Sequence, residues 1–293
     1  MVALQQLLNG LTLGAVYTLV ALGFSLVMGV LGVLNIAVAE LFMIGGYVAL
    51  TLLTQGWPLP AAILAAMVAA GIVGAVIERV AYRPFADAPP IIPLLSTLGC
   101  SIFLQNTVVN YWGSDPLQLP DGIIVSNFEL AGLRVSGTQL AVIGFAVLLV
   151  AVTAFLVQRT RPGRALRAVA ENRDVARLMG VPARQIIGIT FVLSGVLAGA
   201  AGALIGLHYS AVHPFIGVET GLKAIAVMVI GGVTRTWGVL LAGPLVGVAE
   251  VMSIYLGGSA VRDFVVYGLM IAVLLLRPQG LLGKSAQQGG ERV

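Results

Sequence analysis

The sequence predicts an all-α fold, a polytopic transmembrane helical bundle with about eight to ten spans. Hydrophobic residues make up 59% of the chain and charged residues only 10%, whereas about a quarter of the residues in a soluble domain are charged. Residues 1–39 and 41–77 contain no Asp, Glu, Lys or Arg, and each run is longer than the roughly 20 residues that cross a bilayer. The apolar runs are continuous rather than alternating, which favours helices over a β-barrel.

Turn-forming residues divide the apolar sequence into nine expected spans. Asn35 is expected to cap the second span, and Pro58 lies in the turn that ends it. The seventh span has only 14 residues, so we expect it to be tilted, interrupted or re-entrant. The expected spans are residues 7–28, 35–53, 60–77, 91–109, 139–157, 185–207, 220–233, 237–255 and 264–276.

These spans form one membrane domain over residues 1–293, divided by two polar segments. The first helical half, residues 1–158, contains a polar loop at 111–137 that we expect to face outward, because Asp115, Asp121 and Glu129 outnumber Arg134 there. A basic segment follows at 159–184. The second helical half is 185–276 and the tail is 277–293.

The basic residues predict the orientation of the chain. Thirteen of the sixteen Lys and Arg residues can be placed on one side of the membrane, and such residues collect on the cytosolic side. We therefore expect the C-terminus in the cytosol and, with nine spans, the N-terminus outside. The thirteen are Arg79, Arg83, Arg159, Arg161, Arg164, Arg167, Arg173, Arg177, Arg184, Arg235, Arg277, Lys284 and Arg292.

A few polar residues in or beside the apolar spans are candidates for a translocation path, because ionisable groups in a membrane face an interior or water. The candidates are Asn35, Glu40, Lys223 and Glu250. Structural explanations stay open for them. Glu219 precedes Lys223 by four residues, the favourable order for an ion pair within a helix, and Glu40 can interact with a helix dipole. Glu250 has no partner nearby in the sequence.

Four glycines in the sixth span lie on one helical face. They are Gly195, Gly199, Gly202 and Gly206. Such a face lets a neighbouring backbone approach closely. We expect helix packing, with a smooth pore lining as the alternative.

Catalytic and metal-binding motifs are not predicted. His208 and His213 have no acidic or cysteine partner at ligand spacing, so a surface loop is the preferred interpretation, and the lone Cys100 excludes an internal disulfide. Lys284 resembles the end of a phosphate-binding loop, but Pro278 stands where that motif requires Gly. We expect no enzyme activity, no metal or cofactor held by this chain, and no nucleic-acid partner.

The basic segment predicts a short amphipathic helix. Val175, Leu178 and Met179 recur at helical spacing, while arginines occupy another face. Gly180 is a typical stop signal. The helix is therefore expected over about residues 172–179, after a helical or turning basic stretch. Contact with anionic lipid alone would explain such a pattern.

Four sequence blocks carry a resemblance to a known family. They read LGFSLVMGVLGVLNIAVAELFMIGGYVAL, GRALRAVAENRDVARLMGV, GLKAIAVMVIGGVTRTWGVLLAGPLVGVAE and LLLRPQGLLG. With these blocks the chain resembles the permease subunits of branched-chain amino acid ABC importers, of the LivH type. The resemblance implies a bacterial inner (plasma) membrane protein. It also implies three kinds of partner: a second, LivM-like permease, two cytosolic ATPase subunits that bind the ATP, and an extracytoplasmic solute-binding protein.

The same resemblance assigns the basic segment a role. Residues 171–180 match the coupling helix that docks in a groove of the ATPase. The ATPase-coupling residues implied are Arg164, Glu171, Asn172, Arg173, Asp174, Arg177 and Gly180. The chain departs from the coupling loop of other ABC importers. Of that pattern it keeps only the spacing between an acidic residue, Asp174, and Gly180. It also has Val38 and Ala39 before Glu40, where many relatives carry His-Gly.

Three questions stay open at this level. The tetrapeptides at residues 43–46 and 229–232, MIGG and VIGG, suggest an inverted repeat. An ion-coupled secondary transporter or channel that acts without ATPases is the alternative function. The solute, whether a branched-chain amino acid, urea or a short amide, and the choice between a homodimer and a heterodimer are not determined.

Overall fold

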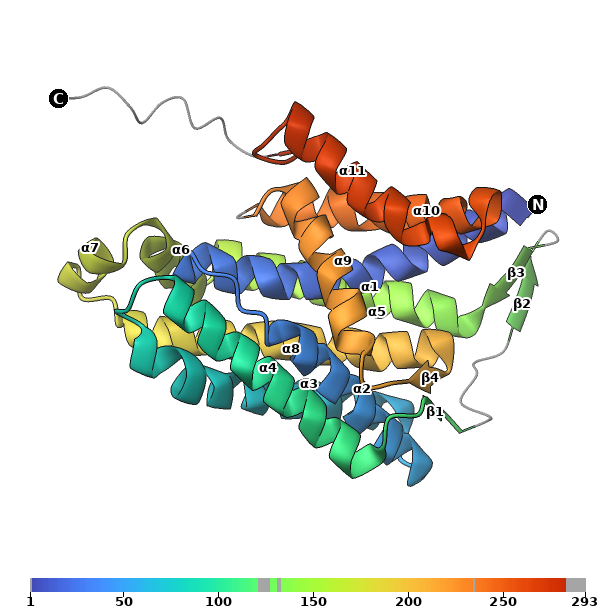
Figure 1. Ribbon diagram of the computed structural model, residues 1–293, viewed down its shortest axis with the longest axis horizontal. Coiled ribbons are helices and arrows are strands. Elements are labelled where there is room, and N and C mark those ends of the chain that lie inside the picture. Colours follow the sequence, from blue (N-terminus) through green and yellow to red (C-terminus); the bar gives the residue numbers. More distant parts are fainter. Residues whose placement is uncertain (1, 121–126, 131–132, 234, 283–293) are drawn as a thin grey trace.

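The computed structural model describes residues 2–120, 127–130, 133–233 and 235–282. It is a helical bundle elongated along one axis (Figure 1). A π-helical turn, η1 (Glu78–Tyr82), and a 3-10 turn, η2 (Arg83–Phe85), extend α3 beyond its predicted end, and η3 (Ser259–Val261) precedes the last helix. The helices are α1 (Val2–Leu31), α2 (Val38–Thr54), α3 (Leu59–Ile77), α4 (Ile91–Trp112), α5 (Gly137–Arg159), α6 (Arg161–Glu171), α7 (Arg173–Leu178), α8 (Ala183–Tyr209), α9 (Ile216–Gly231), α10 (Thr236–Gly257) and α11 (Arg262–Leu276).

Among the described residues, seven helical segments are long and apolar enough to cross a membrane. The helices α2, with 17 residues, and α9, with 16, are shorter. In Figure 1, α9 crosses the long axis of the bundle steeply instead of running along it. The predicted polytopic helical fold is confirmed, and the number of nine spans stays a prediction. The seventh span is a single continuous helix, which starts four residues earlier than expected, at Ile216.

The two ends of the bundle differ in structure (Figure 1). One end, here called the α7 end, holds α6, α7 and η1. The other, the strand end, holds the start of α1 and two small antiparallel pairs. β1 (Leu117–Gln118) pairs with β4 (Ala211–Val212), and β2 (Asn127–Leu130) pairs with β3 (Leu133–Ser136). These strands were not predicted, because two to four residues are too few to show a period. Asp121, predicted in the outward loop, lies outside the described residues.

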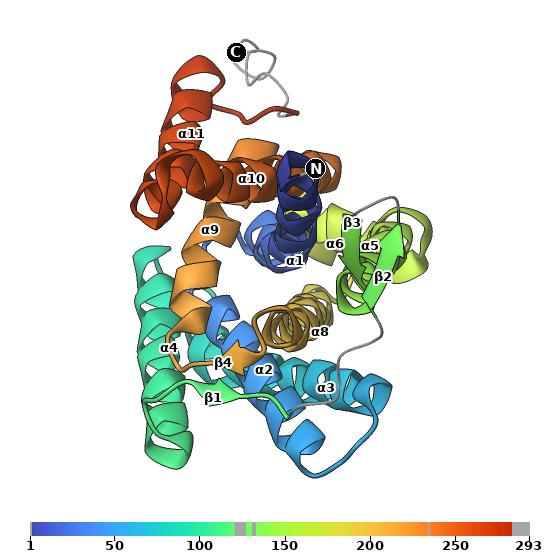
Figure 2. The ribbon, with the colours of Figure 1, turned by 90° about the vertical axis from the view of Figure 1, so that its right-hand side faces the viewer.

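The helix α8 lies at the centre with α1, as the view from the strand end shows (Figure 2). Its glycines allow this packing. A side chain at Gly195 or Gly199 would overlap α3 at Ala70 or Ala66, and one at Gly202 would overlap the backbone carbonyl of Phe42 in α2. The glycine face is thus occupied by neighbouring helices along most of its length.

The pairing of α8 with α3 has a counterpart in the pairing of α1 with α10, and these two contacts are the most extensive in the bundle. Gly10 and Gly14 of α1 meet the backbone of Gly247 and Gly243 in α10. The helices α1 and α8 run in opposite directions (Figure 1). In each of these two pairs, a helix of one half packs against a helix of the other half, and the pairs run in opposite directions (Figure 1). An inverted repeat would have this arrangement.

The tetrapeptides that suggested the repeat do not occupy equivalent places. MIGG lies in the middle of α2, whereas VIGG lies at the end of α9. The two helices instead meet through Gly217, which contacts Ala39 and Met43, and through Gly221, which contacts Ala39. The tetrapeptide match therefore does not mark equivalent positions of a repeat. A pair of glycines recurs by chance in a glycine-rich chain.

Candidate functional sites

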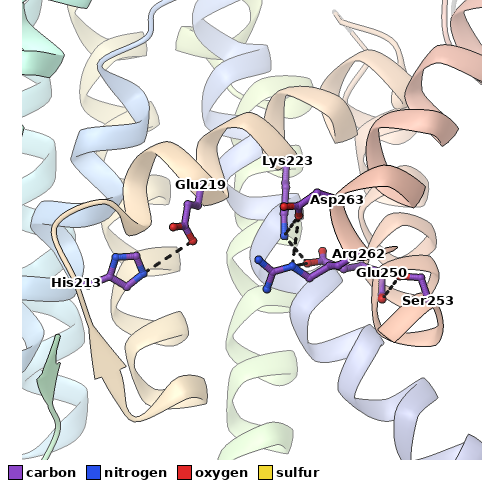
Figure 3. Close-up of polar contacts among 7 residues, drawn as sticks. All are labelled: His213, Glu219, Lys223, Glu250, Ser253, Arg262 and Asp263. Carbon is purple, nitrogen blue, oxygen red and sulfur yellow. Dashed lines mark hydrogen bonds and ion pairs between the residues drawn. The ribbon is translucent and has the colours of Figure 1, made fainter. Parts of the chain in front are cut away.

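Four charged side chains from α9, α10 and α11 form one network (Figure 3). The Lys223 ammonium lies 2.5 Å from Glu250 Oε1 and 3.2 Å from Asp263 Oδ1. Arg262 Nε lies 3.3 Å from Asp263 Oδ1 and 3.6 Å from Glu250 Oε1. The Lys223 and Glu250 side chains are only 6% and 1% exposed. We call these four residues the charge cluster.

The local sequence explains how the cluster is assembled. Glu250 lies in the second half of α10, and α11 begins with Arg262 and Asp263. Between these helices Gly258 adopts a φ of +82°, a left-handed conformation that glycine adopts without strain. The chain therefore turns back sharply, and the first turn of α11 comes beside Glu250.

The ion pair between Glu219 and Lys223, which the sequence left open as a structural explanation, is not formed. Lys223 turns to Glu250 and Asp263, while the Glu219 carboxylate lies 4.0 Å from His213 Nε2. Glu219 is 60% exposed. An exposed pair contributes little free energy, whereas a buried ammonium requires close compensation.

A cavity of about 200 Å³ adjoins the cluster toward the strand end. One part of its wall is apolar, from Leu13, Ile205 and Ile216. Lys223 and Arg262 line it on the cluster side, and His213 and Glu219 also line it. His213 lies in the loop between β4 and α9 and also lines this cavity. An apolar pocket with a few placed polar groups is the usual form of a small-molecule site.

The other two path candidates lie apart from this cluster. Glu40 is fully buried in the first turn of α2, and its Oε1 accepts a 2.9 Å hydrogen bond from Ser101 Oγ of α4. Asn35 Oδ1 accepts from the backbone N–H of Ala37 at 3.1 Å, and α2 begins only at Val38, so Asn35 is not the N-cap. Within the described residues, neither side chain bonds to the charge cluster.

Arg262 and Asp263 were not among the predicted site residues. The signal was present, because an adjacent Arg-Asp pair stands directly before the last apolar span. Their partners lie on two other helices, and no sequence spacing links them.

The basic segment forms two helices rather than one. The Thr160 hydroxyl accepts from the Gly163 N–H at the start of α6. Asn172 then caps α7, because its Oδ1 accepts from the N–H groups of Asp174 and Val175, each at 3.0 Å. Gly180, with a φ of +81°, follows the end of α7. The short helix expected over 172–179 thus corresponds to α7, and the basic stretch before it is α6.

The apolar face of α7 has no cover within the described chain. Leu178 and Met179 are 87% and 79% exposed, and Val175 is 53% exposed. Only Ala176 of this helix is buried. Large exposed apolar groups gathered on one short helix are typical of an interaction surface.

The predicted coupling residues divide into tethered and exposed side chains. Arg173 Nη1 donates to the carbonyl oxygen of Ala86 at 3.1 Å and lies 3.7 Å from Asp87, so α7 is tied to the segment before α4. Arg177 pairs with Asp174 at 3.6 Å on the surface. Arg164 and Glu171 are exposed.

Basic side chains gather at the α7 end. Arg79, Arg83, Arg177 and Arg184 line one open groove beside α7 and the start of α8. Lys284 and Arg292 lie outside the described residues. The segregation of these arginines from the strand end is the pattern that orients a membrane protein.

A multi-pass helical body, a polar cavity within it and a projecting amphipathic helix together define a membrane transport subunit, a permease. Residues 6–274 match the family model described as branched-chain amino acid transport system / permease component, and the chain belongs to this family.

Curated relatives extend over nearly the whole chain. The chain is 40% identical to the high-affinity branched-chain amino acid transport system permease protein BraD of Pseudomonas aeruginosa, with 96% of each chain covered. It is 36% identical, again over 96% of each chain, to the corresponding permease protein LivH of Escherichia coli K12. The LivM permease protein of the same organism is 27% identical, over 94% of this chain and 70% of LivM. No solved structure matches the chain.

Proposed function

We propose that the chain is the membrane permease subunit of an ATP-driven importer for branched-chain or related amino acids. BraD and LivH, which match it over 96% of its length, are named as permeases for such amino acids. In this proposal the chain lies in a bacterial inner membrane, with the α7 end and the C-terminus in the cytosol and the N-terminus outside. It holds no cofactor, and its ATPase partners bind the ATP.

The observation that carries the proposal is the uncovered apolar face of α7. Leu178 and Met179 project from the basic end of the molecule with most of their surface exposed. A lipid-facing helix would lie along the bilayer surface with its apolar side in the acyl region. Here Asn172 caps the start of α7 and Gly180 follows its end, so α7 is a short helix at the tip of the molecule. This shape is suited to a socket in a cytosolic partner.

The tether of α7 to the membrane body supplies a route for coupling. Movement of α7 by the ATPases would act on α8 through the short connection at Gly180, and on the segment before α4 through the Arg173–Ala86 hydrogen bond. Such movement changes access only if the ATPases bind α7 with different free energy in the two states.

The resemblance to LivM supports a second, related permease as the partner in the membrane. Two related chains would enclose the translocation path between or within them. An external solute-binding protein would deliver the solute at the strand end, which is opposite to α7 (Figure 1).

The test is transport by reconstituted protein. The chain is placed in liposomes with the permease, ATPases and binding protein encoded beside its gene, and uptake of labelled L-leucine is measured with and without enclosed ATP. Uptake that needs ATP and every subunit is expected. Uptake by the chain alone, driven by an ion gradient without ATP, would contradict the proposal.

The charge cluster favours one alternative, an ion-coupled transporter acting alone. Buried ionisable groups inside a membrane protein mark ion and substrate pathways. Lys223, however, is already compensated by two carboxylates. The lone-chain liposomes in the same experiment decide between these two functions.

A further inference from the structure

The cavity beside the charge cluster carries opposite charges on separate sides. Arg262 makes its closest contacts with Glu250 and Asp263 through Nε. Its two Nη nitrogens form the outer end of the guanidinium, and Figure 3 shows this end directed to the side on which Glu219 and His213 lie. Both Arg262 and Glu219 line the cavity.

The Glu219 carboxylate is the negative group of this pair. Its closest described partner is His213 Nε2, at the outer limit of an ion pair, 4.0 Å. Glu219 therefore retains most of its capacity to accept hydrogen bonds. The cavity thus offers the planar Arg262 guanidinium as a hydrogen-bond donor and, on another side, the Glu219 carboxylate as an acceptor.

Apolar side chains complete the wall. Leu13 of α1, Ile205 of α8 and Ile216 of α9 line the same cavity. A ligand that carries a carboxylate, an ammonium and an aliphatic group on one carbon would match all three surfaces. A neutral amide such as urea could hydrogen-bond to both groups, but it would lack the two ion pairs that a zwitterion forms with them.

We propose that this cavity binds the zwitterionic group of an aliphatic α-amino acid, with the ligand carboxylate on the Arg262 guanidinium and its ammonium on Glu219. The ligand side chain would lie against Leu13, Ile205 and Ile216. This proposal rests on the proposed function and assigns a solute site to it. Lys223 lies closest to the two carboxylates of the cluster, Glu250 and Asp263. Arg262 contacts them through Nε, which leaves its Nη atoms available for the ligand.

The site lies toward the strand end of the bundle, because Tyr209, at the end of α8, and Ala211, in β4, line it. In the proposed orientation this end faces the solute-binding protein. The cavity is therefore the first acceptor of the solute rather than the point of release to the cytosol.

The test measures ligand binding to the purified complex of the chain with its partner subunits, in nanodiscs and without the solute-binding protein. Binding of labelled L-leucine is competed with unlabelled L-leucine, with isocaproate, which lacks the ammonium, and with isoamylamine, which lacks the carboxylate. Leucine is expected to bind tightest, since each analogue forgoes one charge-assisted contact.

Two variants then assign the groups. Glu219→Gln is expected to weaken leucine and isoamylamine about tenfold or more while isocaproate is unchanged. Arg262→Gln is expected to weaken leucine and isocaproate while isoamylamine is unchanged. Asp115→Asn, an exposed carboxylate after α4, is the matched control and should change none of them.

A structural role alone would weaken all three ligands equally, and that result would overturn the proposal. So would equal affinity of the unaltered complex for leucine and isocaproate, or no binding of leucine by a complex that imports it. Absence of ATP-dependent import in the liposomes would instead show that the proposed function itself is wrong. Because Glu219 is exposed, its variant is expected to fold even where Arg262→Gln does not.

Discussion

Lys223 of α9 and Glu250 of α10 form a buried ion pair of 2.5 Å, although 27 residues separate them in the sequence. Asp263, at 3.2 Å, makes Lys223 the bridge between three helices. Removing one member of a buried pair leaves the other charge uncompensated, which costs more than the pair contributes as a whole.

We therefore predict that Lys223→Met destabilises the folded protein by about 3–5 kcal/mol. Thermal unfolding of the detergent-solubilised chain measures the effect. The double variant Lys223→Met with Glu250→Leu should recover part of the loss, since it removes both buried charges. A double variant less stable than the single one would show that Arg262, 3.6 Å from Glu250, compensates this carboxylate without Lys223.

The exposed apolar tip of α7 makes a second prediction. Leu178→Ser should weaken binding of the ATPase subunits to the permease, because an exposed leucine that becomes buried contributes about 1.5–3 kcal/mol. Co-purification and the stimulated ATPase rate measure this. Leu256→Ser, at an equally exposed leucine near the other end of the bundle, is the control. Normal ATPase binding by the Leu178 variant would exclude this face as the docking surface.

The acidic residues of the coupling segment carry a third prediction. Glu171→Arg and Asp174→Arg each reverse the charge of an exposed residue, so insertion and folding should be unaffected. We expect ATP hydrolysis to continue while leucine uptake falls, because the contact that transmits movement is changed. Both rates are measured in the same liposomes, and normal uptake in both variants would contradict the coupling role.

Arg173 and Arg177 provide a matched pair on α7. Arg173 donates to the Ala86 carbonyl, whereas Arg177 pairs, among the described residues, with exposed Asp174 at 3.6 Å. Arg173→Ala should therefore reduce uptake per ATP hydrolysed, and Arg177→Ala should have the smaller effect. Equal effects of the two would mean that the tether does not transmit movement.

The glycine face of α8 gives a prediction about stability. A Cβ at Gly202 would overlap the backbone carbonyl of Phe42, which cannot move without shifting α2. Gly202→Ala should cost about 1–3 kcal/mol as overpacking. Gly206→Ala meets only side chains, those of Val212 and Leu119, and should cost less. Gly144→Ala in α5 meets nothing within 4 Å and should be neutral or stabilising, as thermal unfolding would show.

Much of the architecture was predictable because the bilayer restricts it. Continuous apolar runs require helices, and a break such as the one at Pro58 predicted where α2 ends and α3 begins. The α7 helix was predictable for a local reason, because Asn172 and Gly180 are its own start and stop signals. These features depend on residues that are neighbours in the sequence.

The charge cluster was not predictable in this way. Lys223 has a suitable acidic residue one turn away in Glu219, and the sequence alone favours that pair. The ammonium instead meets Glu250 and Asp263, because packing of α9 against α10 and α11 removes Lys223 from water and leaves Glu219 exposed. Burial, which decides the strength of an ion pair, is a property of the assembled helices.

The sequence by itself therefore determined that this protein is a helical membrane permease with one basic end and a capped helix in its basic segment. Only the tertiary structure decided that Arg262 and Glu219 line one cavity, and that the apolar face of α7 is left uncovered. The physical reason is that periodicity and capping act over one or two helical turns. The position of a charge in a low-dielectric interior depends on which distant helices enclose it.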